Sequence, residues 1–168
     1  MAWHPSHLVL SGLMASGKTA VGIEVARALG LPLSDSDVVI TTQTGHTGRQ
    51  IAERDGVEAL HDLEARHLLD ALGGEPAVVA AAASVLDDPG CLQAIAAVRM
   101  VFLDVEPAVL VHRLAAQSHR RAIADPLAEL AAMRERRLSA AVGAGAIVID
   151  ATIATPAEVA AEIVRLVG

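Results

Sequence analysis

The sequence predicts an α/β fold in which helices flank a five-stranded parallel sheet. Two observations support this prediction. Short apolar runs alternate with amphipathic stretches along the chain, an order typical of parallel strands joined by helices. A glycine-containing loop, GLMASGKT, joins the first apolar run to the first amphipathic stretch. The length of 168 residues indicates one domain, residues 1–168, with a core large enough to fold without disulfides or metals.

The first two strands are expected at residues 8–10 and 31–33, where short apolar runs stand. The amphipathic segment between them predicts a helix over 18–29. Gly30 is expected to end this helix, because glycine adopts the left-handed conformation of a helix C-terminus without strain.

Two short helical segments are expected at 38–42 and 50–54, with turn-forming glycines between them. A longer amphipathic helix is expected at 57–72, and the Gly-Gly pair that follows it is expected to end it. The run AVVAAAAS at 77–84 predicts a buried strand that leads into a loop, although its alanines are equally compatible with a helix.

The second half of the chain continues the alternation of helix and strand, and each of its four helices opens on a proline. The expected helices are 88–97, 107–116, 126–142 and 156–168, and the expected strands are 98–105 and 146–150. The segment QSHRRAIAD, at about 117–125, is polar, basic and poorly periodic. We therefore expect it to form a mobile lid.

Composition excludes several classes of function. Hydrophobic residues make up 53% of the chain, which argues against intrinsic disorder. The net charge of −7, with one Trp, one Phe and no Tyr, argues against nucleic-acid binding. One cysteine, Cys91, rules out an internal disulfide and fits a cytoplasmic location. No segment resembles a signal peptide or a membrane span, so no membrane partner is expected.

The loop that follows the first strand fits the P-loop pattern G-x-x-x-x-G-K-[ST] at every position. Its backbone N–H groups and the start of the next helix would surround phosphate oxygens. Lys18 would reach the β- and γ-phosphates, and the Thr19 hydroxyl could coordinate Mg²⁺. A chance match remains the alternative. The expected nucleotide-binding residues of this loop are Gly12, Ala15, Ser16, Gly17, Lys18 and Thr19.

Two further polar segments point to phosphoryl transfer. Asp35 and Asp37 follow the second expected strand, at the sheet edge where ligands bind in open parallel sheets. One carboxylate could serve Mg²⁺ and the other an acceptor hydroxyl, although Asp37 could instead cap the following helix. Arg120 and Arg121 in the lid could neutralise a transferring phosphoryl group, or could simply form a solvated basic loop.

Asp104 and Asp150 each end an apolar strand and could be mistaken for metal ligands. Because each stands just before a helix-opening proline, we expect capping or turn formation at both positions. The seven histidines show no zinc-binding spacing.

In the order of its motifs the chain resembles the shikimate kinase family. The segments that carry the resemblance are GLMASGKTAVGIEVARALGLPLSDSDVVI, TGRQIAE, VFLDVEPAVLVHRL and DATIATPAEVAAEIV. The resemblance implies ATP and Mg²⁺ as cofactors, with Lys18 and Thr19 at the phosphates and Asp35 supporting the metal through water. It further implies that Asp37 orients or deprotonates the acceptor hydroxyl and that Arg120 acts from the lid. On the adenine side, it implies that Arg113 stacks on the base and that Pro156 contributes to the same site.

The departures from the family pattern fall mostly on the acceptor side. The family's Phe-Arg pair becomes Leu60-His61, its three glycines become Ala82-Ala83-Ser84, and its R-x-P-x-Y segment becomes Arg136-Arg137-Leu138-Ser139-Ala140. We place the retained arginine at Arg136. One arginine and a histidine do not reproduce the bidentate grip of two arginines on a carboxylate.

These observations predict a kinase of shikimate-kinase type, a small P-loop domain that phosphorylates a hydroxyl of a small polyol, cyclitol or sugar. Shikimate itself is the conservative assignment. The alternatives are a gluconate-type carbohydrate kinase, a nucleoside or nucleotide kinase, and a nucleotide-binding protein without catalysis. The near absence of aromatic residues disfavours the nucleoside kinase. A monomer is expected.

Overall fold

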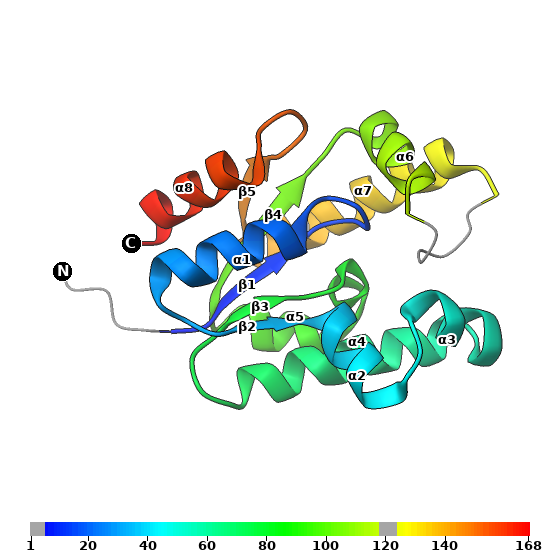
Figure 1. The fold of residues 1–168 in the computed structure, drawn as a ribbon, viewed down its shortest axis with the longest axis horizontal. Helices are drawn as coiled ribbons and strands as arrows, with labels where there is room; N and C mark the ends of the chain where they lie inside the picture. Colours follow the sequence, from blue (N-terminus) through cyan, green and yellow to red (C-terminus); the bar gives the residue numbers. More distant parts are fainter. Residues whose placement is uncertain (1–5, 118–123) are drawn as a thin grey trace.

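The computed structural model describes residues 6–117 and 124–168 (Figure 1). Arg120 and Arg121, with most of the expected lid, lie outside the described residues. The five strands form one parallel sheet in the order β2-β3-β1-β4-β5, which confirms the predicted α/β fold. The strands are β1 (Leu8–Ser11), β2 (Leu33–Asp35), β3 (Val78–Ala80), β4 (Arg99–Asp104) and β5 (Ile147–Asp150).

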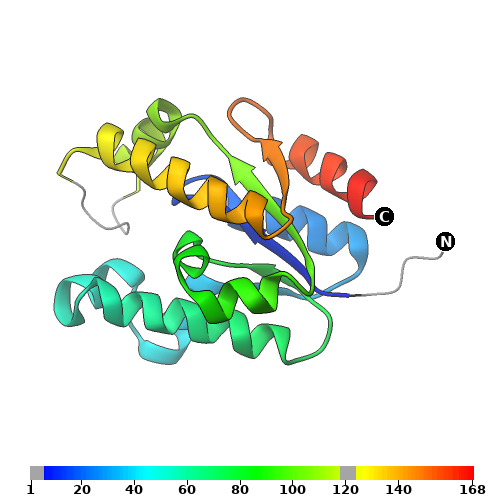
Figure 2. The ribbon, with the colours of Figure 1, turned by 180° about the vertical axis from the view of Figure 1, so that it is seen from behind.

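Helices cover both faces of the sheet. They are α1 (Lys18–Leu29), α2 (Ser36–Thr44), α3 (Gly48–Asp55), α4 (Val57–Leu72), α5 (Pro89–Ile95), α6 (Pro107–Ala115), α7 (Pro126–Gly143) and α8 (Pro156–Val167), with a 3₁₀ turn η1 (Ala83–Asp87). Figure 1 shows α1 and α8 on one face, and Figure 2 shows α5 and α7 on the other. No helix in residues 6–117 and 124–168 is long and apolar enough to cross a membrane.

The central strands are buried on both faces, so their apolar residues alternate between two separate cores. Leu8 and Leu10 of β1 pack into the core beneath α1 and α8, whereas Val9 packs into the core beneath α4 and α5. In β4, Leu103 joins the first core and Phe102 the second. These continuous apolar strands hold the carboxyl ends of β1 and β4 in fixed positions.

Local signals in the sequence set the helix boundaries. Gly30 ends α1 in the left-handed conformation, as predicted. Thr47 caps α3 and Thr155 caps α8, each through a capping box, and Pro156 begins α8. Asp88 caps α5 by accepting a hydrogen bond from the backbone N–H of Cys91 at 2.8 Å.

The second strand lies two residues later than predicted. The backbone N–H of Leu31 donates to the carbonyl of Ala26, so Leu31 takes part in the C-terminal cap of α1. The strand instead pairs Leu33 with Val78 and carries Asp35 at its end. An apolar run is a poor guide here because β2 is a short edge strand with polar residues.

The segment 77–84, predicted as a buried strand that leads into a loop, contains a short strand and the start of a 3₁₀ turn. The strand β3 covers only Val78–Ala80, and η1 begins at Ala83. The helices α2 and α3 each begin two residues before their predicted starts and extend beyond their predicted ends.

Gly12 occupies a position that no other residue fits. Its φ is +154°, and a Cβ there would lie 2.7 Å from both the carbonyl oxygen of Leu103 and the Oγ of Ser16. We expect Gly12→Ala to lower the free energy of unfolding by about 2–4 kcal/mol, because overpacking adds to backbone strain. Urea denaturation of the nucleotide-free protein measures this loss. Gly30→Ala is the control, since its φ is +66° but no atom lies within 4 Å of the added Cβ. An equal loss in both variants would contradict the prediction.

Candidate active site

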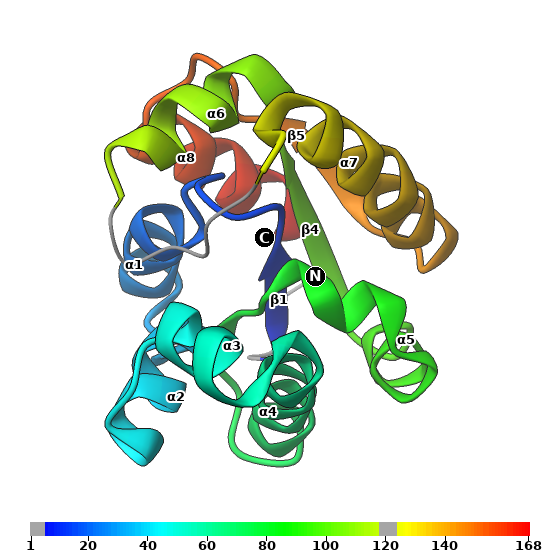
Figure 3. The same cartoon turned by 90° about the vertical axis from the view of Figure 1, so that its right-hand side faces the viewer.

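A pocket of about 460 Å³ opens at the carboxyl ends of the parallel strands. Asp35 and Ala80, the last residues of β2 and β3, line it together with the loop between β1 and α1. Figure 3 shows α3 and α4 on one side of the P-loop and α6 and α8 on the other. This is the edge of an open parallel sheet where ligands bind.

The P-loop, residues 12–17, is shaped as a cradle for an anion. Ala15 has φ 64° and Gly17 φ 96°, so the backbone turns through the left-handed region twice. The start of α1 has no side-chain cap, which leaves its first N–H groups available to a ligand. The Oγ of Ser16 is buried, and no described residue bonds to it. These features fit a bound phosphate.

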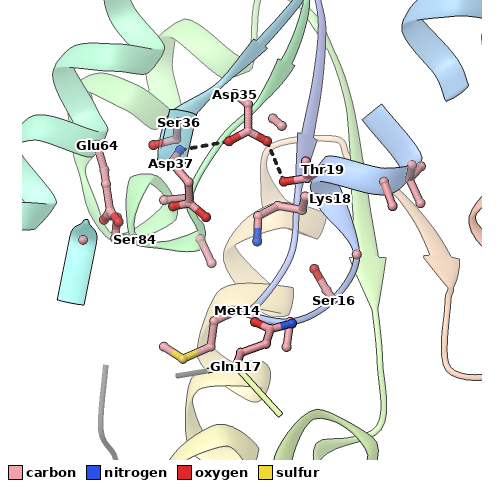
Figure 4. Close-up of a pocket in the computed structure, with 18 of the residues that line it drawn as sticks. Met14, Ser16, Lys18, Thr19, Asp35, Ser36, Asp37, Glu64, Ser84 and Gln117 are labelled. Atoms are coloured by element: carbon pink, nitrogen blue, oxygen red, sulfur yellow. Dashed lines mark hydrogen bonds between the residues drawn. The ribbon is translucent and has the colours of Figure 1, made fainter. Parts of the chain in front are cut away.

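Lys18 lies at the start of α1, and its ammonium group donates to the carbonyls of Gly12 at 2.7 Å and Leu13 at 3.1 Å. Figure 4 shows the Lys18 ammonium and the Asp37 carboxylate extending into the same space. Gly12 itself does not line the pocket but supplies one of these carbonyls. The P-loop backbone therefore holds the Lys18 ammonium next to the site proposed for the phosphates.

Thr19 and Asp35 place a hydroxyl and a carboxylate side by side. The Thr19 hydroxyl donates to Oδ2 of Asp35 at 2.6 Å, while Oδ1 accepts from the backbone N–H of Asp37 at 2.9 Å (Figure 4). A hydroxyl and a carboxylate suit Mg²⁺, which takes few protein ligands and completes its shell with phosphate and water. In the described part of the chain, no group of three or more His, Cys, Asp or Glu side chains is placed to hold a metal ion.

The alternative that Asp37 caps the following helix is wrong. Asp35 is the N-cap of α2, and its side chain accepts from the backbone of Asp37 and Val38. Asp37 instead belongs to the first turn of α2 and lines the pocket. The helix begins two residues earlier than predicted, so the capping position falls on the first of the two aspartates.

One end of the pocket, which we call the α8 end, is lined by Arg113, Ala151, Ala154, Pro156 and Val159. Arg113 of α6 donates through Nη1 to the carbonyl of Ala15 at 3.2 Å and through Nη2 to that of Thr152 at 3.2 Å. Its guanidinium therefore ties the P-loop to the loop that follows β5. Both Arg113 and Pro156, expected at the nucleotide, lie here.

The opposite end, the α4 end, is lined by Asp37, Leu60, His61, Glu64, Ala82, Ala83, Ser84 and Arg137. His61 and Glu64 are three residues apart in α4 and share one face of the helix. The Ser84 hydroxyl donates to the Glu64 carboxylate. Sequence reasoning missed Glu64, although its position one turn after His61 was a signal.

Burial raises the pKa of Glu64, and the nearby Asp37 carboxylate raises it further. The hydrogen bond from Ser84 and the positive charges of Lys18 and Arg137 act in the opposite direction without cancelling the rise. The α4 end therefore contains a carboxyl group whose ionised form is disfavoured by its surroundings.

The placement of Arg136 in the pocket is wrong, and Arg137 lines it instead. The Arg137 side chain is 7% exposed and that of Arg136 is 58% exposed. Adjacent residues on a helix point about 100° apart, so only one of the pair can face the pocket. Because the Pro and Tyr of the family's R-x-P-x-Y segment are absent here, the sequence did not show which of the two arginines corresponds to the Arg of that segment.

Asp104 and Asp150 end neighbouring strands but do different things. Asp150 accepts a hydrogen bond from the backbone N–H of Thr152 at 2.9 Å, which confirms the predicted turn. Asp104 instead pairs with Arg134 through two hydrogen bonds of 2.7 Å, so the expectation of capping or turn formation is wrong at this position.

Glu64→Gln is expected to stabilise the protein at neutral pH. Because the pKa of Glu64 is higher in the folded than in the unfolded chain, its ionisation opposes folding. The penalty is absent below the unfolded pKa and grows as the pH rises through the folded pKa. We expect a gain of roughly 0.5–2 kcal/mol at pH 7.5 that shrinks towards pH 4. Chemical denaturation at both pH values measures it, with the exposed Glu75→Gln as control. A loss of stability at pH 7.5 would show that the contact with Ser84 dominates.

Comparison with known proteins agrees with this geometry. The family model for shikimate kinase matches residues 14–167. A shikimate kinase from Thermobifida fusca is 32% identical over 153 residues, which cover 90% of this chain and 89% of that protein.

Solved structures share the fold. The structure described as shikimate kinase from Acinetobacter baumannii in complex with shikimate superimposes with a TM-score of 0.89 at 22% identity, covering 96% of this chain and 92% of that one. A gluconokinase from Sinorhizobium meliloti gives a TM-score of 0.59 at 20% identity, covering 97% and 94%. From the family match and the sequence relatives, this chain belongs to the shikimate kinase family of phosphotransferases that act on an alcohol group.

Proposed function

We propose that this protein transfers the γ-phosphoryl group of ATP, bound with Mg²⁺, to a hydroxyl of a small polyol, cyclitol or sugar-like acceptor. The observation that carries the proposal is the convergence of Lys18, the Thr19–Asp35 pair and Asp37 in one pocket. Phosphoryl transfer needs positioning and charge stabilisation more than covalent help, and these residue types supply both.

The α8 end is the proposed adenine site. Hydrogen bonds of a guanidinium lie in its plane, so the contacts of Arg113 with backbone carbonyls leave a flat face for a base. Pro156 lines the same end. The phosphates would then extend along the P-loop, over Ala15, Ser16 and Gly17, to the Lys18 ammonium.

Thr19 and Asp35 would hold the magnesium ion, Asp35 through water. When bound, the ion would neutralise negative charge that develops on the phosphate groups during transfer. The buried Asp35 carboxylate already accepts hydrogen bonds from Thr19 and from the start of α2, which fixes its orientation.

In the proposed reaction Asp37 holds the acceptor hydroxyl and takes its proton as the oxygen attacks the γ-phosphorus. The bond between that phosphorus and the bridging oxygen of ADP breaks as the new O–P bond forms. Lys18 would stabilise the transferring group from the P-loop. Arg120, whose position is not among the described residues, is proposed for the same task from the lid.

The test is ADP release by the purified protein with MgATP, first without an acceptor and then with shikimate, gluconate, and uncharged polyols and sugars. Acceptor-dependent ADP release, with a phosphorylated product seen by ³¹P NMR, is the expected result. In parallel, titration calorimetry measures whether the protein binds ATP. Bound ATP without stimulation by any acceptor would favour a nucleotide-binding protein without catalysis.

A further inference from the structure

We propose that the acceptor carries no carboxylate, and that the α4 end selects an uncharged polyhydroxyl compound over a sugar acid or a cyclitol acid. This inference rests on the proposed function, because it names the acceptor class for the same site. It is carried by the ion pair between Arg137, the buried arginine of the α4 end, and Asp87.

The charge of Arg137 is already compensated inside the protein. Nε and Nη2 donate to the same oxygen of Asp87 at 3.2 and 3.0 Å, and Nη1 lies 3.9 Å from the sulfur of Met133. A carboxylate ligand would have to compete with Asp87 for Nε and Nη2, which form one of the two bidentate faces of the guanidinium.

Asp87 stays ionised in this arrangement. Its partial burial alone would raise its pKa, but the hydrogen bonds from Arg136 and Arg137 outweigh that effect and the pKa lies below its usual value. Arg136 donates to the second oxygen of Asp87 at 3.2 Å. The aspartate therefore remains a permanent negative partner of Arg137.

Apart from Arg137 and the titratable His61, the charged side chains of the α4 end are acidic, whereas Lys18 and Arg49 line adjoining parts of the pocket. Asp37 and Glu64 both line the α4 end, and the charge of Asp37 contributes to the raised pKa of Glu64. Arg49 of α3 also lines the pocket, but its Nε donates to Glu53 at 2.8 Å and its side chain is 38% exposed. A ligand carboxylate at this end would thus lie close to the Asp37 carboxylate and to Glu64, and the like charges would repel.

Hydroxyl groups suit the same surface. An ionised carboxylate accepts hydrogen bonds and a protonated one can also donate, so Asp37 and Glu64 match the hydroxyl groups of a polyol, which do both. The Ser84 hydroxyl shows this pairing within the protein, since it donates to Glu64. An uncharged acceptor would gain these bonds without the cost of burying a carboxylate.

Pairs of acceptors that differ only at the carboxylate test the inference on the full chain. Shikimate is compared with the analogue in which CH₂OH replaces its carboxylate, and gluconate with glucitol. We expect the uncharged member of a pair to have at least a tenfold higher kcat/KM. A carboxylate member that is used equally well or better would overturn the inference.

A binding measurement separates this inference from the proposed function. Calorimetry with the same pairs, in the presence of Mg²⁺ and a non-hydrolysable ATP analogue, reports acceptor preference even if no turnover occurs. Absent turnover would then count against the kinase proposal alone. Failure of every uncharged member to bind, or tighter binding of the carboxylates, would overturn the inference.

Asp87→Asn tests the ion pair itself. Removing the negative charge leaves Arg137 available, so we expect the preference to move towards the carboxylate members by at least tenfold. Asp104→Asn is the matched control, because it breaks a comparable ion pair with Arg134 of the same helix outside the pocket. An unchanged preference in folded Asp87→Asn, or an equal shift in the control, would overturn the role of Asp87.

Discussion

Replacing Asp37 by asparagine is expected to lower kcat by about 10²- to 10⁴-fold, the usual contribution of a positioned general base. Asparagine keeps the size of aspartate and can still accept a hydrogen bond, but it cannot take the proton of the acceptor hydroxyl. Because Asp37 lies outside the α8 end, ATP affinity should stay the same or rise slightly as a negative charge near the phosphates is removed. Steady-state turnover with the best acceptor and calorimetry with ATP measure the two quantities.

The interpretation of this variant depends on the fold being intact. Asp35, and not Asp37, caps α2, so the substitution should leave the melting temperature close to that of the wild type. Asp62→Asn is a suitable control, since Asp62 is an exposed residue of α4 that does not line the pocket. Turnover of Asp37→Asn within a factor of about three of the control would remove Asp37 from the chemistry.

The parts of the fold that sequence predicted well are those with strong local signals. The helices α1 and α4 begin and end as expected, because glycine ends one and a Gly-Gly pair interrupts the other. The edge strand β2 was misplaced because its Ser34 and Asp35 are polar, and only its pairing with β3 identifies it as a strand. Sheet pairing depends on contacts far apart in the chain, which a local pattern does not contain.

The candidate site likewise has a part that the sequence predicted and a part that it did not. The P-loop could be placed residue by residue, since each position of the motif has its own physical requirement. The α4 end could not, because its members come from separate elements: Glu64 from α4, Ser84 from η1 and Arg137 from α7. Whether Arg136 or Arg137 faces the pocket depends on how α7 is oriented about its own axis, which the sequence does not show. That orientation is set by packing, such as the burial of Leu130 and Ala141.

The preference for an uncharged acceptor that we propose for the α4 end likewise depends on a tertiary contact. Asp87 is 50 residues from Arg137 in the sequence, and nothing in either segment indicates that they pair. A motif can therefore retain an arginine while a distant aspartate changes what that arginine can bind. In the proposal made above, it is this aspartate partner that keeps Arg137 from binding the carboxylate of an acceptor.

Replacing Lys18 by alanine is expected to lower kcat/KM for ATP by about 10²- to 10³-fold, because a preorganised positive charge at the transferring phosphoryl group is lost. The ammonium donates to the carbonyls of Gly12 and Leu13 without a ligand, so it is already positioned at the P-loop. Acceptor-dependent ADP release measures the loss. Activity within tenfold of the wild type would contradict the proposed role.

A second measurement tests Lys18 without turnover, because it is the only lysine of the sequence. An amine-reactive acylating reagent can then modify just two kinds of site, Lys18 and the α-amine at the start of the chain. We expect saturating MgATP to slow acylation of Lys18 at least tenfold, while the α-amine, an internal reference, reacts at an unchanged rate. AMP should protect much less, since it lacks the β- and γ-phosphates that the ammonium would contact. Equal labelling of Lys18 with and without MgATP would place the lysine away from the phosphates, and the loss of activity in Lys18→Ala would then need another cause.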